Sequence, residues 1–183
     1  MPQFSPDGKS IAWVSQERDG YESDKKRLFV ANLETGEKQD LTQSFDYNAD
    51  AIQWLPDGKS LYMIACKEAV THIWQVGVAD KQIRQITSGQ YDYVSMHSVG
   101  NTMAAIRQSQ VNPSEVFAVN TQTGEAAEIS FENKAILDQL TMPKSESRWI
   151  KTTDNKQMLT WVVYPPHFDP AKKYPAILYC QGG

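Results

Sequence analysis

The fold is decided by a motif that occurs twice, FSPDGKSIAWV at residues 4–14 and WLPDGKSLYMI at residues 54–64. Each copy joins a turn to an apolar run, and the two copies are 50 residues apart. Pro presets φ, Asp hydrogen-bonds its own backbone and Gly accepts a left-handed conformation, so Pro-Asp-Gly-Lys favours a tight hairpin. The motif therefore predicts β-hairpins at equivalent places in a repeated unit.

A third, decayed copy, VGNTMAAI at residues 99–106, has lost the Pro-Asp but keeps a turn followed by an apolar run. After each copy comes a second apolar run, at residues 28–33, 73–78 and 116–119. Each of these runs is closed by a turn and followed by a more polar strand, which ends at Thr42, Thr87 or Ser130. The sequence thus contains three repeats of one four-stranded unit.

Units of about 40 to 50 residues with four short strands are typical of β-propeller blades. Strands that are apolar on both faces fit between neighbouring sheets, and the polar last strand fits an outer edge. An all-β sandwich is the alternative, but it does not explain the repeat. We predict a mainly β chain with a partial propeller of about three blades. Propellers typically have about four to eight blades, so we expect further blades outside this sequence.

The last residues form another signal: the strand-like run YPAILYC at residues 174–180 is followed by Gln181, Gly182 and Gly183. A strand that leads into a glycine turn is how α/β-hydrolases place backbone N–H groups around a developing oxyanion. We therefore interpret the chain as ending inside a catalytic scaffold. It contains no Gly-x-Ser-x-Gly motif, and the nearest approach, MHSVG at residues 96–100, lacks the first glycine. By itself the chain is expected to be inactive.

The repeats, together with YPPHFD at residues 164–169, KKYP at residues 172–175 and the strand into Gly-Gly, resemble the prolyl oligopeptidase family of serine peptidases. The likeness is to its dipeptidyl-peptidase V and acylaminoacyl-peptidase branches. The resemblance implies the C-terminal blades of a propeller at residues 1–132, an interdomain crossing at 133–146 and the first strands of an α/β-hydrolase domain at 147–183. Those strands would be residues 147–153, 157–164 and 174–181.

The same resemblance places a Ser-Asp-His triad downstream of Gly183, so that no catalytic residue lies in this chain. The oxyanion-loop candidates are Gln181, Gly182 and Gly183. Members of the family commonly have His or Tyr before the Gly-Gly, whereas this chain has Gln181.

Blade topology puts the loops between second and third strands at the end of the propeller from which the chain leaves for the hydrolase. These loops are residues 16–27, 67–70 and 109–114, and the first is long and charged. An exopeptidase that recognises a free N-terminus needs a carboxylate for the α-ammonium group. Glu22, with Tyr21 beside it, is the substrate-binding candidate. The alternative is a solvated loop or a patch of salt bridges between the two domains.

Composition excludes several classes of function. Net charge is −4, and Lys and Arg form no stripe, which argues against nucleic acid or an anionic membrane as partner. The three histidines lack metal-ligand spacing, so we expect no metal and no cofactor. Cys66 and Cys180 lie in apolar runs and are expected to be buried small hydrophobes.

Two functions fit these observations. The first is a fragment of a serine exopeptidase that releases dipeptides or acyl-amino acids from peptide N-termini, with the propeller as a substrate gate. The second is a TolB-like propeller that binds a protein and performs no chemistry. For the first, the resemblance implies peptide substrates and a periplasmic or exported protein. Open blade edges also predict association between molecules.

Overall fold

The computed structural model describes residues 1–180 of the 183-residue chain. The chain divides into two compact units, Met1–Lys134 and Ala135–Gly183. Each unit is described by itself below. The candidates Gln181, Gly182 and Gly183 lie outside the described residues.

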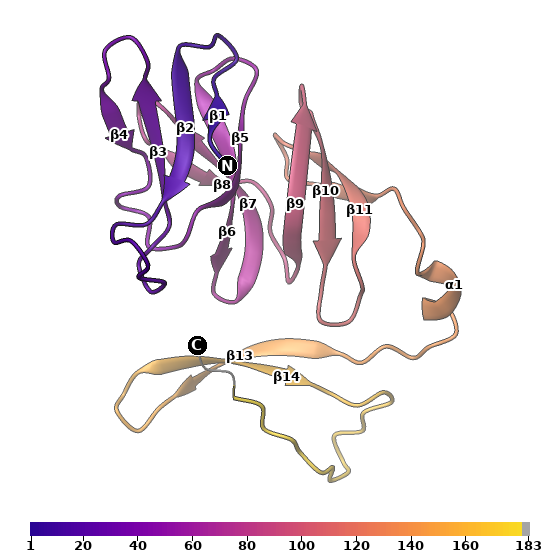
Figure 1. The fold of residues 1–183 in the computed structure, drawn as a ribbon. Coiled ribbons are helices and arrows are strands. Elements are labelled where there is room, and N and C mark those ends of the chain that lie inside the picture. Colours follow the sequence, from indigo (N-terminus) through magenta and orange to yellow (C-terminus); the bar gives the residue numbers. More distant parts are fainter. Residues whose placement is uncertain (181–183) are drawn as a thin grey trace. The chain divides into compact units, whose positions relative to one another are not determined.

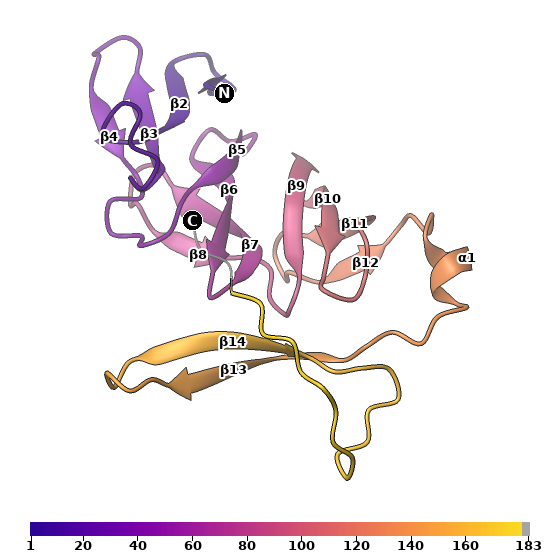
Figure 2. The same ribbon diagram turned by 60° about the horizontal axis from the view of Figure 1, so that its bottom comes forward.

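The first unit consists of three four-stranded antiparallel sheets whose strands are hydrogen-bonded in chain order (Figures 1 and 2). The first sheet contains β1 (Gln3–Phe4), β2 (Ser10–Ser15), β3 (Arg27–Asn32) and β4 (Lys38–Asp40). The second contains β5 (Asp50–Trp54), β6 (Ser60–Lys67), β7 (Val70–Gly77) and β8 (Ile83–Gln85). The third contains β9 (Asp92–Val99), β10 (Thr102–Gln108), β11 (Glu115–Asn120) and β12 (Ala126–Glu128). These sheets confirm the predicted blades.

The two Pro-Asp-Gly-Lys turns have the expected chemistry. Asp7 Oδ1 accepts a hydrogen bond from Lys9 N at 3.0 Å, and Asp57 Oδ1 accepts one from Lys59 N at 2.9 Å. The glycine of each turn has a positive φ, 69° in the first copy and 66° in the second. A hydrogen bond from Ser5 lowers the pKa of Asp7 below its ordinary value. Each turn joins the first strand of its sheet to the second.

Two hydrophobic cores lie between successive sheets, and β6 contributes to both. Leu61, Met63 and Ala65 pack with the first sheet, whereas Tyr62 and Ile64 pack with the third. All five side chains are buried. Because alternate side chains of a strand point to opposite faces, this consecutive burial requires a sheet on each side. The prediction of a strand between two sheets is therefore confirmed for β6, whereas β2 is mostly half-buried in the described structure.

The outer edge of each sheet is held by a hydroxyl group that recurs with the repeat. Thr42, Thr87 and Ser130 follow the fourth strands, and each accepts a hydrogen bond from a backbone N–H 14 residues earlier. The donors are Leu28 at 2.9 Å, Ile73 at 3.0 Å and Val116 at 2.8 Å. These bonds extend the pairing of third and fourth strands past the short ladder. Thr42 and Thr87 are buried, so losing the hydroxyl would leave a buried donor unsatisfied.

The second unit is a two-stranded antiparallel hairpin of β13 (Ser145–Lys151) and β14 (Gln157–Val163). The short helix α1 (Lys134–Leu137) starts at the boundary between the units. The hairpin agrees with two of the three strands expected after residue 146. Their assignment to an α/β-hydrolase domain stays a prediction.

Three expectations from the sequence were wrong in the described residues. Residues 174–180 form no strand, because no neighbouring strand among residues 1–180 pairs with them. Cys180 lies in that segment and is exposed. Cys66 is also exposed, because it stands next to the end of β6, beyond the stretch that the adjacent sheets cover. Both cysteines are free thiols.

A pair of glycines tests how the sheets pack. Gly36 and Gly124 occupy the same position of the turns after β3 and β11, with φ of 72° and 77°. A Cβ on Gly36 would meet nothing within 4 Å, whereas one on Gly124 would lie 2.1 Å from the carbonyl oxygen of Ile86, the residue that follows β8 of the second sheet. Gly36→Ala is therefore expected to lower the free energy of unfolding by about 1 kcal/mol, because it adds only the strain of a side chain in a left-handed backbone conformation. Gly124→Ala should lower the free energy of unfolding by at least about 1 kcal/mol more, since backbone must move.

Urea unfolding of the two variants, followed by tryptophan fluorescence, measures this difference directly. Equal losses of stability would contradict the close packing of the third sheet on the second.

Candidate functional site

The connection between β2 and β3 carries the predicted binding residues Tyr21 and Glu22. Its backbone is held by the side chain of Gln16, whose Nε2 lies 3.3 Å from Tyr21 O, 3.2 Å from Glu22 O and 2.9 Å from Asp24 O. One amide group thus gathers three carbonyl groups. The loop is a fixed turn around Gln16, and both candidate side chains are exposed on it.

An ion pair closes this loop. Arg18 Nη2 lies 2.5 Å from Asp24 Oδ1, and the backbone N–H of Arg18 donates to Asp24 Oδ2 at 2.9 Å. The hydrogen bonds from Arg18 lower the pKa of Asp24, and the pairing raises the pKa of Arg18. The guanidinium carbon of Arg18 also lies 3.7 Å from the ring centroid of Tyr21. Tyr21 is therefore positioned by the same arginine that closes the loop.

The other cations of this segment are also occupied within the first unit. Lys25 Nζ donates to the carbonyl oxygens of Thr42, Gln43 and Phe45 at 3.3, 3.2 and 2.6 Å. Lys26 pairs with Asp50 at 3.1 Å. Arg27 pairs with Asp40 at 3.1 Å and with Glu17 at 3.6 Å.

The carboxylate groups of Asp19 and Glu22 have no hydrogen-bond or ion-pair partner among residues 1–180. The cations of this loop thus pair within the first unit, in the loop and with the first two sheets. Two exposed carboxylates remain open to a ligand.

The equivalent connections of the other two sheets are shorter, and Figure 1 shows all three at the same end of the first unit. β6 and β7 are joined by Glu68 and Ala69, whose φ values of 53° and 60° form a tight hairpin. Between β10 and β11, Ser109 Oγ accepts from the backbone N–H groups of Val111 and Asn112 at 3.3 and 3.1 Å. The first sheet therefore has the longest connection at this end.

The chain leaves the third sheet through a cluster around Glu115, which the sequence analysis did not single out. Glu115 is 7% exposed and accepts hydrogen bonds from the Ser130 hydroxyl, from Asn133 N at 2.8 Å and from Asn133 Nδ2 at 2.9 Å. These bonds, that of Ser130 first, lower the pKa of Glu115 to about 2. The carboxylate thus anchors the segment after β12. Only the 14-residue spacing of Val116 and Ser130, repeated in the other sheets, hints at this cluster in the sequence.

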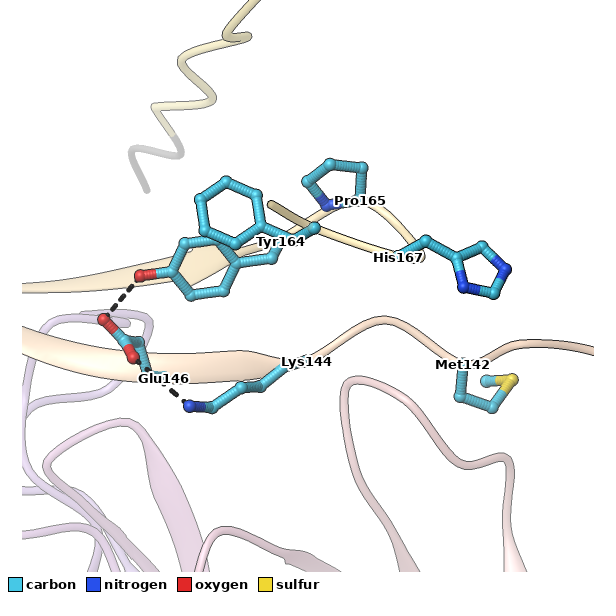
Figure 3. Close-up of a pocket in the computed structure, with 7 residues that line it drawn as sticks. Met142, Lys144, Glu146, Tyr164, Pro165 and His167 are labelled. Atoms are coloured by element: carbon cyan, nitrogen blue, oxygen red, sulfur yellow. Dashed lines mark hydrogen bonds and ion pairs between the residues drawn. The ribbon is translucent and has the colours of Figure 1, made fainter. Parts of the chain in front are cut away.

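A shallow hollow of about 330 Å³ lies in the second unit, lined by Met142, Lys144, Glu146, Tyr164, Pro165, His167 and Phe168 (Figure 3). Tyr164 Oη donates to Glu146 Oε1 at 2.7 Å, and Arg148 pairs with the same carboxylate at 2.5 Å. Hydrogen bonds from Tyr164 and Arg148 lower the pKa of Glu146. The hydrogen bond that Tyr164 donates to Glu146 raises the pKa of Tyr164. The negative charge of Glu146 is thus balanced by Arg148 inside the second unit.

The histidines are separated from one another. His72 is buried, its Nδ1 lies 3.2 Å from Thr87 Oγ1, and burial lowers its pKa. His97 and His167 are exposed on β9 and on the segment after β14. Among residues 1–180, no three His, Cys, Asp or Glu side chains gather as metal ligands. Nor does this part of the chain contain a helix long and apolar enough to cross a membrane.

Comparison with known proteins gives a consistent result. Residues 1–163 match the family model of the TolB beta propeller domain. The chain is 57% identical over 182 residues to a protein of Porphyromonas gingivalis named dipeptidyl-peptidase 5, covering 100% of this chain and 27% of that protein. A protein of the same name from Porphyromonas endodontalis is 50% identical over 182 residues, covering 100% and 26%. The chain therefore spans about a quarter of the length of these curated relatives.

Solved structures share the fold at low sequence identity. The acylaminoacyl peptidase of Pyrococcus horikoshii superimposes with a TM-score of 0.72 at 16% identity, over 92% of this chain and 25% of that one. A putative TolB from Agrobacterium tumefaciens gives a TM-score of 0.58 at 20% identity, over 68% and 46%. Together with the named relatives, these likenesses confirm the resemblance to propeller-containing peptidases.

The Glu115 cluster generates a test of pH dependence. Because the folded-state pKa is depressed, the carboxylate stabilises the fold above the unfolded-state pKa, near 4.5, and that contribution is lost as pH falls toward about 2. Glu115→Gln should therefore lower Tm by about 2–4 °C at pH 7. The difference from the original protein should shrink between pH 4.5 and pH 2.

Thermal unfolding followed by circular dichroism at pH 7, 4 and 2.5 measures the effect. Glu128→Gln, at an exposed glutamate of β12, is the control and should leave Tm unchanged at each pH. A difference for Glu115→Gln that stays constant with pH would show that the carboxylate charge has no part in anchoring this segment.

Proposed function

The chain belongs to the TolB beta propeller domain family, and from this premise we propose that it is the propeller-bearing part of a serine exopeptidase. The whole protein would release dipeptides or acyl-amino acids from peptide N-termini. The observation that carries the proposal is 57% identity along the full chain to a protein named dipeptidyl-peptidase 5. The reaction would be acyl transfer to a serine with histidine as base, on residues that this chain does not contain.

In this proposal the first unit selects substrates and the chemistry occurs elsewhere. The end of the unit with the β2–β3, β6–β7 and β10–β11 connections would face the catalytic chamber and admit peptides but exclude folded proteins. Glu22 would hold the α-ammonium group of the substrate. Its support is geometric: Gln16 and Arg18 fix the loop, while the Glu22 carboxylate is exposed and unpaired among residues 1–180.

A protein-binding propeller without chemistry is the second candidate function. It is favoured by the likeness to the putative TolB structure, which covers 68% of this chain. The second unit argues against it, because its hairpin and the YPPHFD segment lie beyond the three sheets. A propeller that only binds another protein would not require that addition.

The two functions separate in one experiment on the protein encoded by the complete reading frame. A serine exopeptidase should release fluorophore from dipeptidyl coumarin amides and should be labelled by a fluorophosphonate probe. Residues 1–183 expressed alone should do neither, since they contain no Gly-x-Ser-x-Gly motif. A complete protein that is neither labelled nor active would refute the peptidase proposal and favour the binding function.

The role of Glu22 is tested in the same complete protein. Glu22→Gln should lower kcat/KM for dipeptidyl substrates with a free N-terminus by about 10-fold or more, because a charge-assisted hydrogen bond is lost. Substrates with an acetylated N-terminus should be unaffected. Asp19→Asn, at the other unpaired carboxylate of the loop, is the matched control. If both substitutions change kcat/KM equally, the loop acts through general charge and Glu22 has no specific role.

A further inference from the structure

Arg107 in the third sheet has an unusual environment, because its charged group is held by aromatic rings alone. It is the residue before the last of β10, and its guanidinium carbon lies 3.5 Å from the ring centroid of Phe117 and 4.0 Å from that of Tyr91. Two rings this close to one carbon atom cannot share one face of the guanidinium group. The group therefore lies between them, with both faces covered.

The clamp is built from the packing between the sheets. Phe117 is 7% exposed and belongs to the core between the second and third sheets, and Tyr91 packs against that core. Tyr91 is in turn backed by Gly89, where a Cβ would lie 2.8 Å from the tyrosine ring. Both rings are thus fixed, and they fix the plane of the guanidinium group.

The edge of this group has no acceptor within the described structure. The guanidinium group of Arg107 makes no hydrogen bond or ion pair with any of residues 1–180. Its cross-strand partner is Glu115, but the carboxylate of Glu115 is occupied by Ser130 and Asn133. Among residues 1–180, the buried side-chain nitrogen and oxygen atoms without a hydrogen-bond partner include Ser98 Oγ but no nitrogen atom of Arg107. The nitrogen atoms of Arg107 consequently remain open to solvent.

From this geometry we propose that Arg107 is a carboxylate-binding residue for a peptide. Covered faces leave the in-plane edge as the route of approach, and paired N–H donors on that edge match a planar carboxylate in a bidentate arrangement. Stacking between rings also fixes the side chain in advance, so that little conformational entropy is lost on binding. Arg107 is separated from the β10–β11 connection by one residue, at the end of the unit that carries Glu22. The peptide nature of the ligand rests on the proposed function.

Nuclear magnetic resonance titration of the 183-residue chain tests this site with three acetylated tripeptides. Acetyl-Gly-Gly-Gly with a free C-terminal carboxylate and acetyl-Gly-Asp-Gly amide each offer one carboxylate, whereas acetyl-Gly-Gly-Gly amide offers none. The Nε–H signal of Arg107 and the backbone signals of Gln108 and Ser109 should shift with the carboxylate probes only. Comparing those two probes shows whether a terminal or a side-chain carboxylate is preferred. The acetyl group removes the α-ammonium, so the result is independent of Glu22.

Variants separate recognition from simple packing. Arg107→Lys keeps the charge but loses the fork and the stacking, and it should weaken carboxylate binding about tenfold. Arg84→Lys is the matched control, because Arg84 lies on outer strand β8 with its Nη2 donating to Gln75 at 2.8 Å, and binding should not change. If Arg107→Lys does not fold, Tyr91→Leu retains the guanidinium group and removes one ring, and it should weaken binding about threefold.

Three outcomes would overturn the proposal: no shift with either carboxylate probe, equal shifts with the amide probe, or the same affinity in the tested Arg107 or Tyr91 variant. Each would leave Arg107 with a packing role only. The peptidase assay of the complete protein is unaffected by these outcomes, so failure of this site is distinguishable from failure of the proposed function.

Discussion

The packing of one sheet on the next is the constraint on which the first unit depends. The second sheet is buried on both faces: Leu61 and Met63 enter one core, while Tyr62 and Ile64 enter the other. A strand with two apolar faces is stable in water only when both neighbouring sheets are present. Stability is therefore shared along the series of repeats, as in other repeat proteins whose units bury their faces against one another. This rigid stack frees the connections at its end to carry polar and charged groups.

Hydrogen bonds hold this stack at its inner and outer sides. On the inner strands, Gln3 Nε2 donates to Ile52 O at 2.7 Å, and Gln53 exchanges two hydrogen bonds with the backbone of Ser98. At the outer edges, Thr42, Thr87 and Ser130 close each sheet on itself. Apolar packing alone tolerates sliding, whereas these directed bonds fix the register between and within sheets. In the third sheet the outer hydroxyl also meets Glu115, so the position from which the chain leaves is fixed by the same device.

The repeat in the sequence was sufficient to predict the three sheets, because the Pro-Asp-Gly turns and apolar runs act over a few residues. Burial was harder to predict where it depends on how far a neighbouring sheet extends, as Cys66 shows. A strand at residues 174–180 has the right composition, but strand formation also requires a partner.

The sequence was sufficient to locate the candidate loop between β2 and β3 and to count its charges. The fixed conformation of this loop could not be predicted, since it depends on hydrogen bonds from Lys25 to carbonyl groups up to 20 residues away. The environment of Arg107 was not predictable for the same reason, because Tyr91 and Phe117, which enclose its guanidinium group, come from separate segments of the repeat.

Paired and unpaired charges follow a simple pattern at the end of the unit that carries the β2–β3 and β10–β11 connections. In the β2–β3 connection the cations pair with Asp24, Asp40, Asp50 and carbonyl groups of the first unit, and the carboxylates of Asp19 and Glu22 remain unpaired among residues 1–180. In the third sheet the carboxylate of Glu115 is spent internally, and the guanidinium group of Arg107 remains. The two places thus offer unpaired charges of opposite sign, carboxylates in the β2–β3 connection and a guanidinium group on β10. A peptide carries an α-ammonium group at its start and carboxylates further along, so its charges complement this pair. A folded protein partner would be selected by a broad, shaped surface, with binding energy concentrated in buried aromatic and arginine anchors. Under the proposed function, separate charged groups of opposite sign would therefore suit a small, extended ligand better.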